Sequence, residues 1–380
     1  MKLAIAQFTE PAAVEAMPRT KLMRGPTAPR NTCLSKTGSF VGKLSVTTTA
    51  SCPRHRARPA GRWLTVAALL FALFPCFAQS PAATRKLKIV GSFLPAYCVA
   101  ANVAGDAASV ENLLPGAVNP HEFQLAPKDL KRIEEADLIV LNGLALEEWF
   151  SKLANRFPAN GKPKIFRCAD GLEDVLIPIS ASGGIEASKH ADHDHADHAG
   201  HAHGGKYNPH LWLDPMVMAR VATNLSLALS ALDPANTERY RGNAQAYAER
   251  LKELDRRIER TLTPVRSKPF VTLHDAFPYF SRRYQLRLSG VLELEPEVSP
   301  SPRYLGQLVR RMRQDQVPAL FTEPGNTPRI AKQVAADLGI ATVELETLET
   351  GKPEASAYES GLLRIAETLE KHLAKPAPTR

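Results

Sequence analysis

Short apolar runs alternate with longer amphipathic segments in the first half of this chain beyond residue 85. Strands are predicted at 86–92, 110–115, 137–143 and 162–169, and the third of these runs is apolar almost throughout. Apolar side chains at helical spacing predict helices at 126–136 and 146–157. Continuous apolar strands separated by helices are typical of a parallel sheet that is covered on both faces. This half therefore predicts one α/β lobe.

The same alternation returns in the second half of the chain. Strands are predicted at 268–277, 282–294, 318–324 and 340–346, and helices at 301–316, 327–339 and 356–375. The predicted fold class is α/β, with two lobes that each contain a mainly parallel sheet flanked by helices.

A long helical segment separates the two predicted lobes. An amphipathic helix is predicted at 215–232, and residues 233–262 then continue with buried-type positions every three or four residues. A helix of that length would span about 45 Å, longer than a small domain is wide. We expect a rigid strut, the alternative being a helical hairpin bent near Gly242. The expected organisation is an N-terminal lobe at 86–232, a linking helix at 233–263 and a C-terminal lobe at 264–380, with a ligand in the cleft between the lobes.

The N-terminal residues differ in composition from the rest of the chain. Residues 1–78 hold 11 basic and 2 acidic residues, whereas the remainder holds 37 of each, so no nucleic-acid partner is implied. A basic stretch at 54–62, an apolar stretch at 63–74 and a small residue at Ala78 are typical of a secretory signal peptide cleaved near Ala78. We expect a periplasmic protein, and expect translation to start downstream of residues 1–50. Cys76 raises a lipoprotein alternative, although Pro75 replaces the small residue expected before a lipidated cysteine.

Two cysteines, Cys98 and Cys168, remain after the predicted cleavage. An oxidising compartment permits a disulfide between them, and two separately buried thiols are the alternative. The sequence does not decide, because it does not set the distance between the two sulfur atoms.

Three histidines follow predicted strands or lie in strand–helix loops. They are His121 in GAVNPHEF, His210 in NPHLWLDP and His274 in LHDAFPYF. A single histidine in such a loop is usually structural, but three at equivalent positions of a two-lobed fold predict a shared metal site. Imidazole nitrogen suits Zn²⁺, Cu²⁺ and Ni²⁺ better than Mg²⁺ or Mn²⁺, which favour carboxylate oxygens.

A fourth ligand is expected from the segment VELETLETG in the C-terminal lobe. It offers Glu344, Glu346 and Glu349, and we favour Glu346, because it lies at the C-terminal end of the predicted strand. Glu323 is a competing choice, and its alternative role is to orient a histidine from behind.

A histidine-rich run, HADHDHADHAGHAHGG, occupies residues 190–205. Its low complexity and lack of large apolar side chains predict a mobile loop rather than a core element. We expect weak, exchanging zinc sites here, accessory to the main one, and a solvated linker without a metal role is the alternative. The accessory candidates are His190, His193, His195, His198, His201 and His203.

The three histidine motifs resemble those of the zinc-binding substrate-binding proteins of bacterial ABC importers (the ZnuA-like group). KIVGSFLP, ADLIVLNGLALEEW and FTEPGNTPRIAKQVA are similar to family segments in order and spacing, and the similarity covers residues 86–372. Many zinc-binding relatives carry an insertion similar to the histidine-rich run, and manganese-binding relatives typically carry a carboxylate where this chain has His274. The resemblance implies a monomeric periplasmic protein that binds Zn²⁺ through His121, His210, His274 and, from the closest match, Glu346. Some zinc-binding relatives leave that fourth position to water, which is the alternative here.

That resemblance also implies a membrane permease, with its ATPase subunit, as the partner that receives the metal. A periplasmic zinc chaperone is a further partner, and a zinc chaperone or an adhesin on the same fold is the alternative function. A zinc hydrolase, with Glu323 or Glu122 as base, belongs to a different class of function. No compact HExxH motif supports it, and the relatives are binding proteins, so we expect no enzyme.

Overall fold

Two four-stranded parallel sheets organise the part of the chain that the computed structural model describes, which is residues 85–153, 156–157, 161–179, 205–294 and 299–375. The first sheet has the order β2-β1-β3-β4. Its strands are β1 (Leu87–Gly91), β2 (Ala108–Asn112), β3 (Leu138–Leu141) and β4 (Lys164–Arg167). Every residue of β3 is buried, as expected for an inner strand of a parallel sheet covered on both faces. The four predicted strands of the first lobe are therefore confirmed.

The helices of the first lobe are α1 (Leu94–Ala104), α2 (Pro127–Glu134), α3 (Glu148–Ser151) and α4 (Pro215–Leu232). The sequence pattern did not predict α1, because eight of its eleven residues are buried and no polar face gives it a helical period. Among the described residues of the helix predicted at 146–157, only the single turn α3 is α-helical, and Trp149 in it makes an aromatic contact with Phe123. Helix α4 is apolar and long enough to cross a membrane, but half of it is buried inside the protein, which is typical of a core helix.

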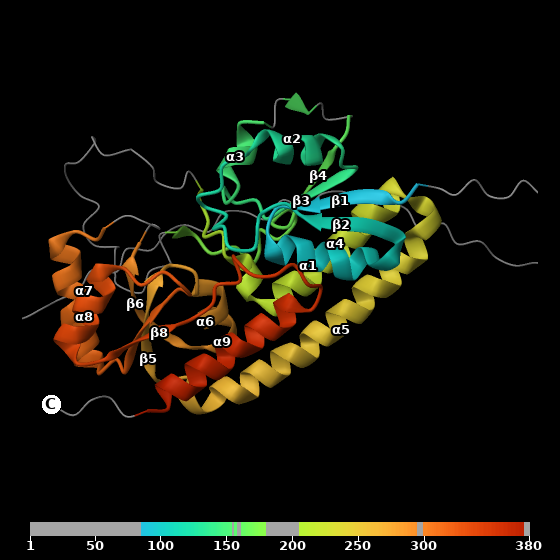
Figure 1. The fold of residues 1–380 in the computed structure, drawn as a ribbon. Helices are drawn as coiled ribbons and strands as arrows, with labels where there is room; N and C mark the ends of the chain where they lie inside the picture. Colours follow the sequence, from blue (N-terminus) through green and yellow to red (C-terminus); the bar gives the residue numbers. More distant parts are fainter. Residues whose placement is uncertain (1–84, 154–155, 158–160, 180–204, 295–298, 376–380) are drawn as a thin grey trace, which may run out of the picture. The chain divides into compact units, whose positions relative to one another are not determined.

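The long helix α5 (Thr237–Leu262) confirms the predicted strut and runs without a break through Gly242 (Figure 1). Its 26 residues span about 39 Å. It starts later than predicted because a short 3₁₀ turn occupies Pro234–Asn236. The apolar face predicted from three- and four-residue spacing is buried against α1, α4 and the last helix, α9 (Ala357–Leu373).

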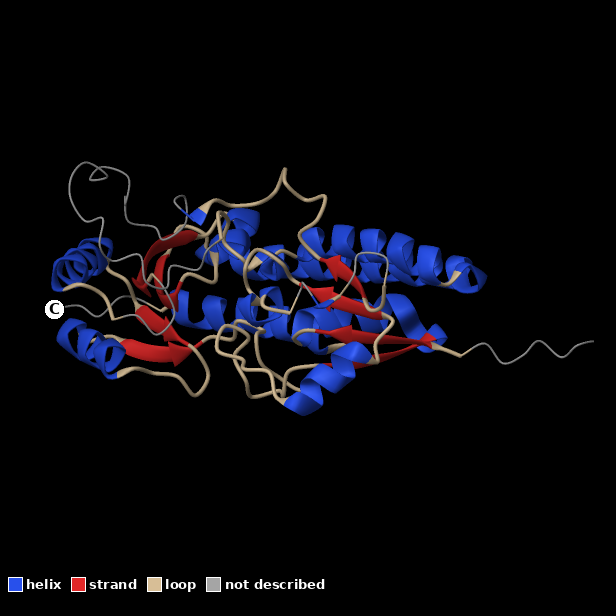
Figure 2. Ribbon diagram, turned by 90° about the horizontal axis from the view of Figure 1, so that it is seen from above, coloured by secondary structure: helices blue, strands red, loops and turns tan. Residues whose placement is uncertain are grey.

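The second sheet has the order β6-β5-β7-β8 and is also parallel throughout. Its strands are β5 (Pro269–His274), β6 (Arg287–Glu293), β7 (Ala319–Thr322) and β8 (Ala341–Glu344), accompanied by α6 (Pro278–Tyr284), α7 (Pro302–Asp315), α8 (Arg329–Leu338) and α9. Figure 2 shows the two sheets as separate groups of strands. Helix α6 ends at Tyr284 and so occupies the start of the predicted strand 282–294. The sequence did not indicate this boundary, because the buried aromatic residues Tyr279, Phe280 and Tyr284 conceal any alternation of polar and apolar positions.

One hydrophobic core connects the two sheets. A single cluster of buried side chains includes Val90 of β1, Tyr247 of α5, Phe270 of β5 and Leu369 of α9. A smaller cluster, which includes Leu273 and Met312, lies among β5, β6, β7, α7 and α8. The long helix is thus packed along its length into a core that both lobes share. The exact lobe boundaries at 232 and 264 stay predictions.

The two cysteines are both free and buried. Burial raises the pKa of the Cys98 thiol to about 12, and that of Cys168 further still. The raised pKa values disfavour the reactive thiolate at neutral pH. Of the two alternatives, the structure has the separately buried thiols.

Candidate metal centre

The three predicted histidines come together at the carboxyl ends of the two sheets. His121 lies in the loop between β2 and α2, His210 directly precedes the 3₁₀ turn Leu211–Leu213 before α4, and His274 is the last residue of β5. Each imidazole side chain is only 4% exposed. Together with Glu349 they offer four ligand atoms that lie within 4.8 Å of one another.

The Nε2 atoms of these imidazoles face one carboxylate oxygen. Oε1 of Glu349 lies 3.2 Å from Nε2 of His121, 3.1 Å from Nε2 of His210 and 3.8 Å from Nε2 of His274. The Nε2 atoms of His210 and His274 are 3.2 Å apart. Three nitrogens and one oxygen converging at these distances have the ligand number and types of a tetrahedral zinc site.

Two copies of the sequence Asn-Pro-His bring His121 and His210 to the centre. The side-chain oxygen of Asn119 accepts a hydrogen bond from the His121 backbone N–H at 2.9 Å, and Asn208 does the same for His210 at 3.0 Å. This side-chain-to-backbone turn is the reason that asparagine favours such loops. The repeated motif therefore sets the backbone direction of two of the histidines.

Further contacts fix how the ligand side chains are oriented. Nδ1 of His210 lies 2.9 Å from Oδ1 of Asn208, and Nδ1 of His274 is paired with the carboxylate of Glu323. Both acceptors select the tautomer that protonates Nδ1 and leaves Nε2 directed at the centre. Oε2 of Glu349 accepts a hydrogen bond from the Thr347 hydroxyl at 3.1 Å. Glu323 thus lies where its expected role behind a histidine requires.

The electrostatics of the cluster favour a cation. Burial alone would raise the pKa of Glu349, but hydrogen bonds with His121, His210 and His274 outweigh burial and lower it well below its ordinary value. Burial lowers the pKa of His210 to about 3, so this imidazole is neutral. Burial also opposes a charged His274, yet Glu323 and Glu349 outweigh it and raise its pKa well above the ordinary value. The buried carboxylate of Glu349 therefore stays ionised, and a protonated His274 balances its charge. A divalent cation can replace that proton as the balancing charge.

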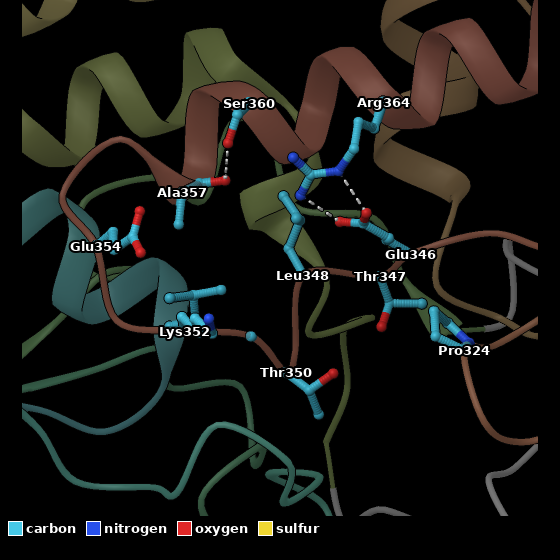
Figure 3. A pocket seen from close by; sticks show the side chains of 12 residues that line it. Pro324, Glu346, Thr347, Leu348, Thr350, Lys352, Glu354, Ala357, Ser360 and Arg364 are labelled. Atoms are coloured by element: carbon cyan, nitrogen blue, oxygen red, sulfur yellow. Dashed lines mark hydrogen bonds and ion pairs between the residues drawn. The ribbon is translucent and has the colours of Figure 1, made fainter.

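Glu346 does not lie in this cluster, so the preference for it as the fourth candidate is corrected in favour of Glu349. The Glu346 carboxylate accepts hydrogen bonds from Nε and Nη2 of Arg364 on α9 at 2.6 and 3.0 Å (Figure 3). It lines a pocket of about 400 Å³ between this loop and α9. The prediction failed because β8 ends at Glu344, and the backbone then turns through a positive φ of 62° at Leu348. That turn directs Glu349, three residues later than predicted, towards the histidines. The third candidate, Glu344, accepts from the Gly325 backbone N–H.

The histidine-rich run at 190–205 and the leader at 1–78 lie outside the described residues, apart from Gly205. The described residues on the two sides of the segment 180–204 pair with each other. The Ile179 N–H donates to the Lys206 carbonyl at 3.2 Å, and the Asn208 N–H donates to the Ile177 carbonyl at 2.8 Å. Asn208 also holds His210, so this pairing connects directly to the loop that carries one of the three histidines.

Comparison with known proteins agrees with this architecture. Residues 89–372 match the family described as zinc-uptake complex component A, periplasmic. The chain is 30% identical over 319 residues to the manganese ABC transporter substrate-binding lipoprotein PsaA of Streptococcus pneumoniae, covering 80% of this chain and 96% of that protein. It is also 30% identical over 297 residues to the zinc-binding lipoprotein AdcA of the same species, covering 76% of this chain and 57% of AdcA. The solved Zn(II)-bound mutant variant of AdcAII from S. pneumoniae superposes with a TM-score of 0.61 at 27% identity, covering 75% of this chain and 99% of that one.

Proposed function

Because this chain belongs to the family of the periplasmic zinc-uptake complex component A, a family of metal-binding substrate-binding proteins of ABC transporters, we propose that its cargo is Zn²⁺. The observation that carries the proposal is the buried set of three imidazole nitrogens and one carboxylate oxygen. The protein would hold the ion between its lobes and release it to a membrane permease that an ATPase subunit drives.

Zinc is favoured over manganese by the chemistry of the ligands. The relatives include both a zinc-binding and a manganese-binding protein, so family membership alone leaves the metal open. Imidazole ligands suit zinc, whereas manganese favours carboxylate and other oxygen ligands. With His274 as a third nitrogen ligand, only Glu349 supplies an oxygen, and four ligands satisfy the tetrahedral preference of zinc.

A competition titration tests this proposal. Metal-free protein should bind one Zn²⁺ tightly, and a large excess of Mn²⁺ should leave that zinc in place, as followed with a chromophoric zinc chelator. A variant without residues 190–205 should retain the tight zinc and lose only weaker binding. Displacement of zinc by equimolar manganese would overturn the assignment of the metal.

Replacing Glu349 and Glu346 separately by glutamine tests which of the two carboxylates is the metal ligand. Glu349→Gln should weaken zinc binding about 100-fold, because a total of about 10–16 kcal/mol shared among four ligands is roughly 3 kcal/mol each. Glu346→Gln is the matched comparison, and we expect a much smaller loss, because the Glu346 carboxylate pairs with Arg364 and is not part of the cluster. The measurement is the zinc dissociation constant of both variants. Weaker binding by the Glu346 variant alone would restore the sequence-based choice.

The setting of this function is also proposed. Both relatives are named lipoproteins, and one of them is named a substrate-binding lipoprotein of an ABC transporter. We infer a periplasmic location reached through the signal peptide predicted to end near Ala78, and a monomer as the working form. The six histidines between His190 and His203 would collect zinc at the mouth of the site, since the run lies just ahead of His210 in the sequence.

A further inference from the structure

A glycine in the interior of α9 requires an explanation. Gly361 is buried in this 17-residue helix, five positions after its N-cap residue Ser356. Glycine within a helix is roughly 1 kcal/mol less favourable than alanine, because its backbone loses more freedom on folding. A helix of this length would therefore be more stable with alanine at this position, unless the space beside the glycine is needed.

Leu348 occupies that space. A Cβ atom at position 361 would lie 2.1 Å from Cδ2 of Leu348 and 3.3 Å from Oε2 of Glu346. The first distance is far inside van der Waals contact, and Leu348 is itself only 2% exposed. The terminal methyl of the leucine side chain thus occupies the place that a Cβ atom at position 361 would take, and a larger residue there would displace it.

This contact bears on the metal cluster because Leu348 directly precedes Glu349. Leu348 has the left-handed backbone conformation that turns Glu349 towards the histidines, and such a conformation in a leucine persists only where the surroundings hold it. Contacts on either side hold the same loop. Nε1 of Trp212 donates to the Thr347 carbonyl at 2.8 Å, and the Gly351 N–H donates to the Gly116 carbonyl at 2.7 Å.

Helix α9 also contacts the loop at a second position. Arg364, three residues after Gly361 and therefore on the same face of the helix, pairs with Glu346 (Figure 3). The helix therefore fixes Glu346 and Leu348, while the intervening Thr347 is held by Trp212. Every residue of the turn that leads into Glu349 has a partner from another element.

We propose that Gly361 is a positioning residue for the metal ligand Glu349, acting through the seat that it provides for Leu348. This inference rests on the proposed function. Helix α9 contributes no ligand to the cluster. It would nevertheless set the position of the Glu349 carboxylate, and thereby the zinc affinity.

The test compares Gly361→Ala with Gly242→Ala. The control is also a helix-interior glycine, but a Cβ there meets nothing within 4 Å. Gly361→Ala should weaken zinc binding about 10- to 100-fold, the usual effect of removing a group that orients a ligand, whereas Gly242→Ala should leave affinity unchanged. Thermal unfolding of the metal-free proteins verifies that both variants fold.

Two further variants separate positioning from general damage. In a Glu349→Gln background, Gly361→Ala should cause no additional loss of zinc affinity, because its effect passes through that carboxylate. Leu348→Ala removes the seated side chain without adding an atom to α9. Leu348→Ala should weaken zinc binding, and adding Gly361→Ala to this variant should reduce the zinc affinity little further.

Three results would overturn the inference. These are wild-type affinity in folded Gly361→Ala, an equal loss in the presence and absence of Glu349, or additive losses for Leu348→Ala and Gly361→Ala. If Glu349→Gln still weakens zinc binding in those experiments, the proposed function stands, and only the positioning role of Gly361 is rejected. If the wild-type protein binds no zinc tightly, the proposed function itself fails, and this inference with it.

Discussion

Replacing His121, His210 and His274 together by alanine removes the tight zinc site. Each imidazole Nε2 is directed at the centre of the cluster, and the three nitrogens make up three of its four ligand atoms. At about 3 kcal/mol for each ligand, the triple variant should lose roughly six orders of magnitude in affinity. Competition with a chromophoric chelator would measure the loss, and metal analysis of the purified protein would show no bound zinc.

The control for the triple variant is His372→Ala. His372 lies on α9 outside the cluster, with its ring 6.5 Å from that of Phe321. It should bind zinc as the wild-type protein does. A triple variant that still retained one tightly bound zinc would show that the site lies elsewhere, for example in the histidine-rich run.

Acid should release the metal, starting above the ordinary titration range of histidine. Glu323 and Glu349 raise the pKa of His274 well above its usual value of about 6.5, even though burial opposes the charged form. Zinc must displace that proton, because a metal-bound imidazole is neutral. Affinity is therefore highest above the pKa of His274 and should fall about tenfold for each pH unit below it. His210, with a pKa of about 3, should add nothing until the solution is far more acidic.

Calorimetry in buffers of different ionisation enthalpy measures this proton. About one proton should leave for each zinc bound at neutral pH. Glu323→Gln removes the neighbouring charge that raises the pKa of His274, so the onset of acid release should move to lower pH. Zinc binding that releases no proton and does not change between about pH 5 and 7 would contradict the proposed charge balance.

Most of the fold could be predicted because its elements have strong periodic patterns. The strands β1, β3, β5 and β7 are short apolar runs, and α5 shows a clear helical period over 26 residues. Helix α1 escaped prediction for the opposite reason, since an element buried on nearly all sides has no polar face from which a period can be recognised. Burial by tertiary contacts, rather than local preference, forms such a helix.

The candidate site divides in the same way. The histidines could be predicted, because each follows a strand or precedes a helix, and their chemistry is specific. Glu349 could not be separated from Glu346, because the choice depends on where β8 ends and on the left-handed backbone of Leu348. We infer that this conformation is stabilised by the packing of Leu348 on Gly361 of α9 and by the hydrogen bond from Trp212 to the neighbouring Thr347. Both are tertiary contacts made by residues outside the loop. No pattern within the segment LETLE predicts these contacts.

The most direct test of the central claim is a crystal structure of the zinc-loaded protein, with anomalous diffraction collected on both sides of the zinc absorption edge. We predict a single strong anomalous peak inside the cluster, about 2.0–2.1 Å from Nε2 of His121, His210 and His274 and about 2.0–2.2 Å from a carboxylate oxygen of Glu349. A peak that lies elsewhere, or that is coordinated by Glu346 in place of Glu349, would contradict the account.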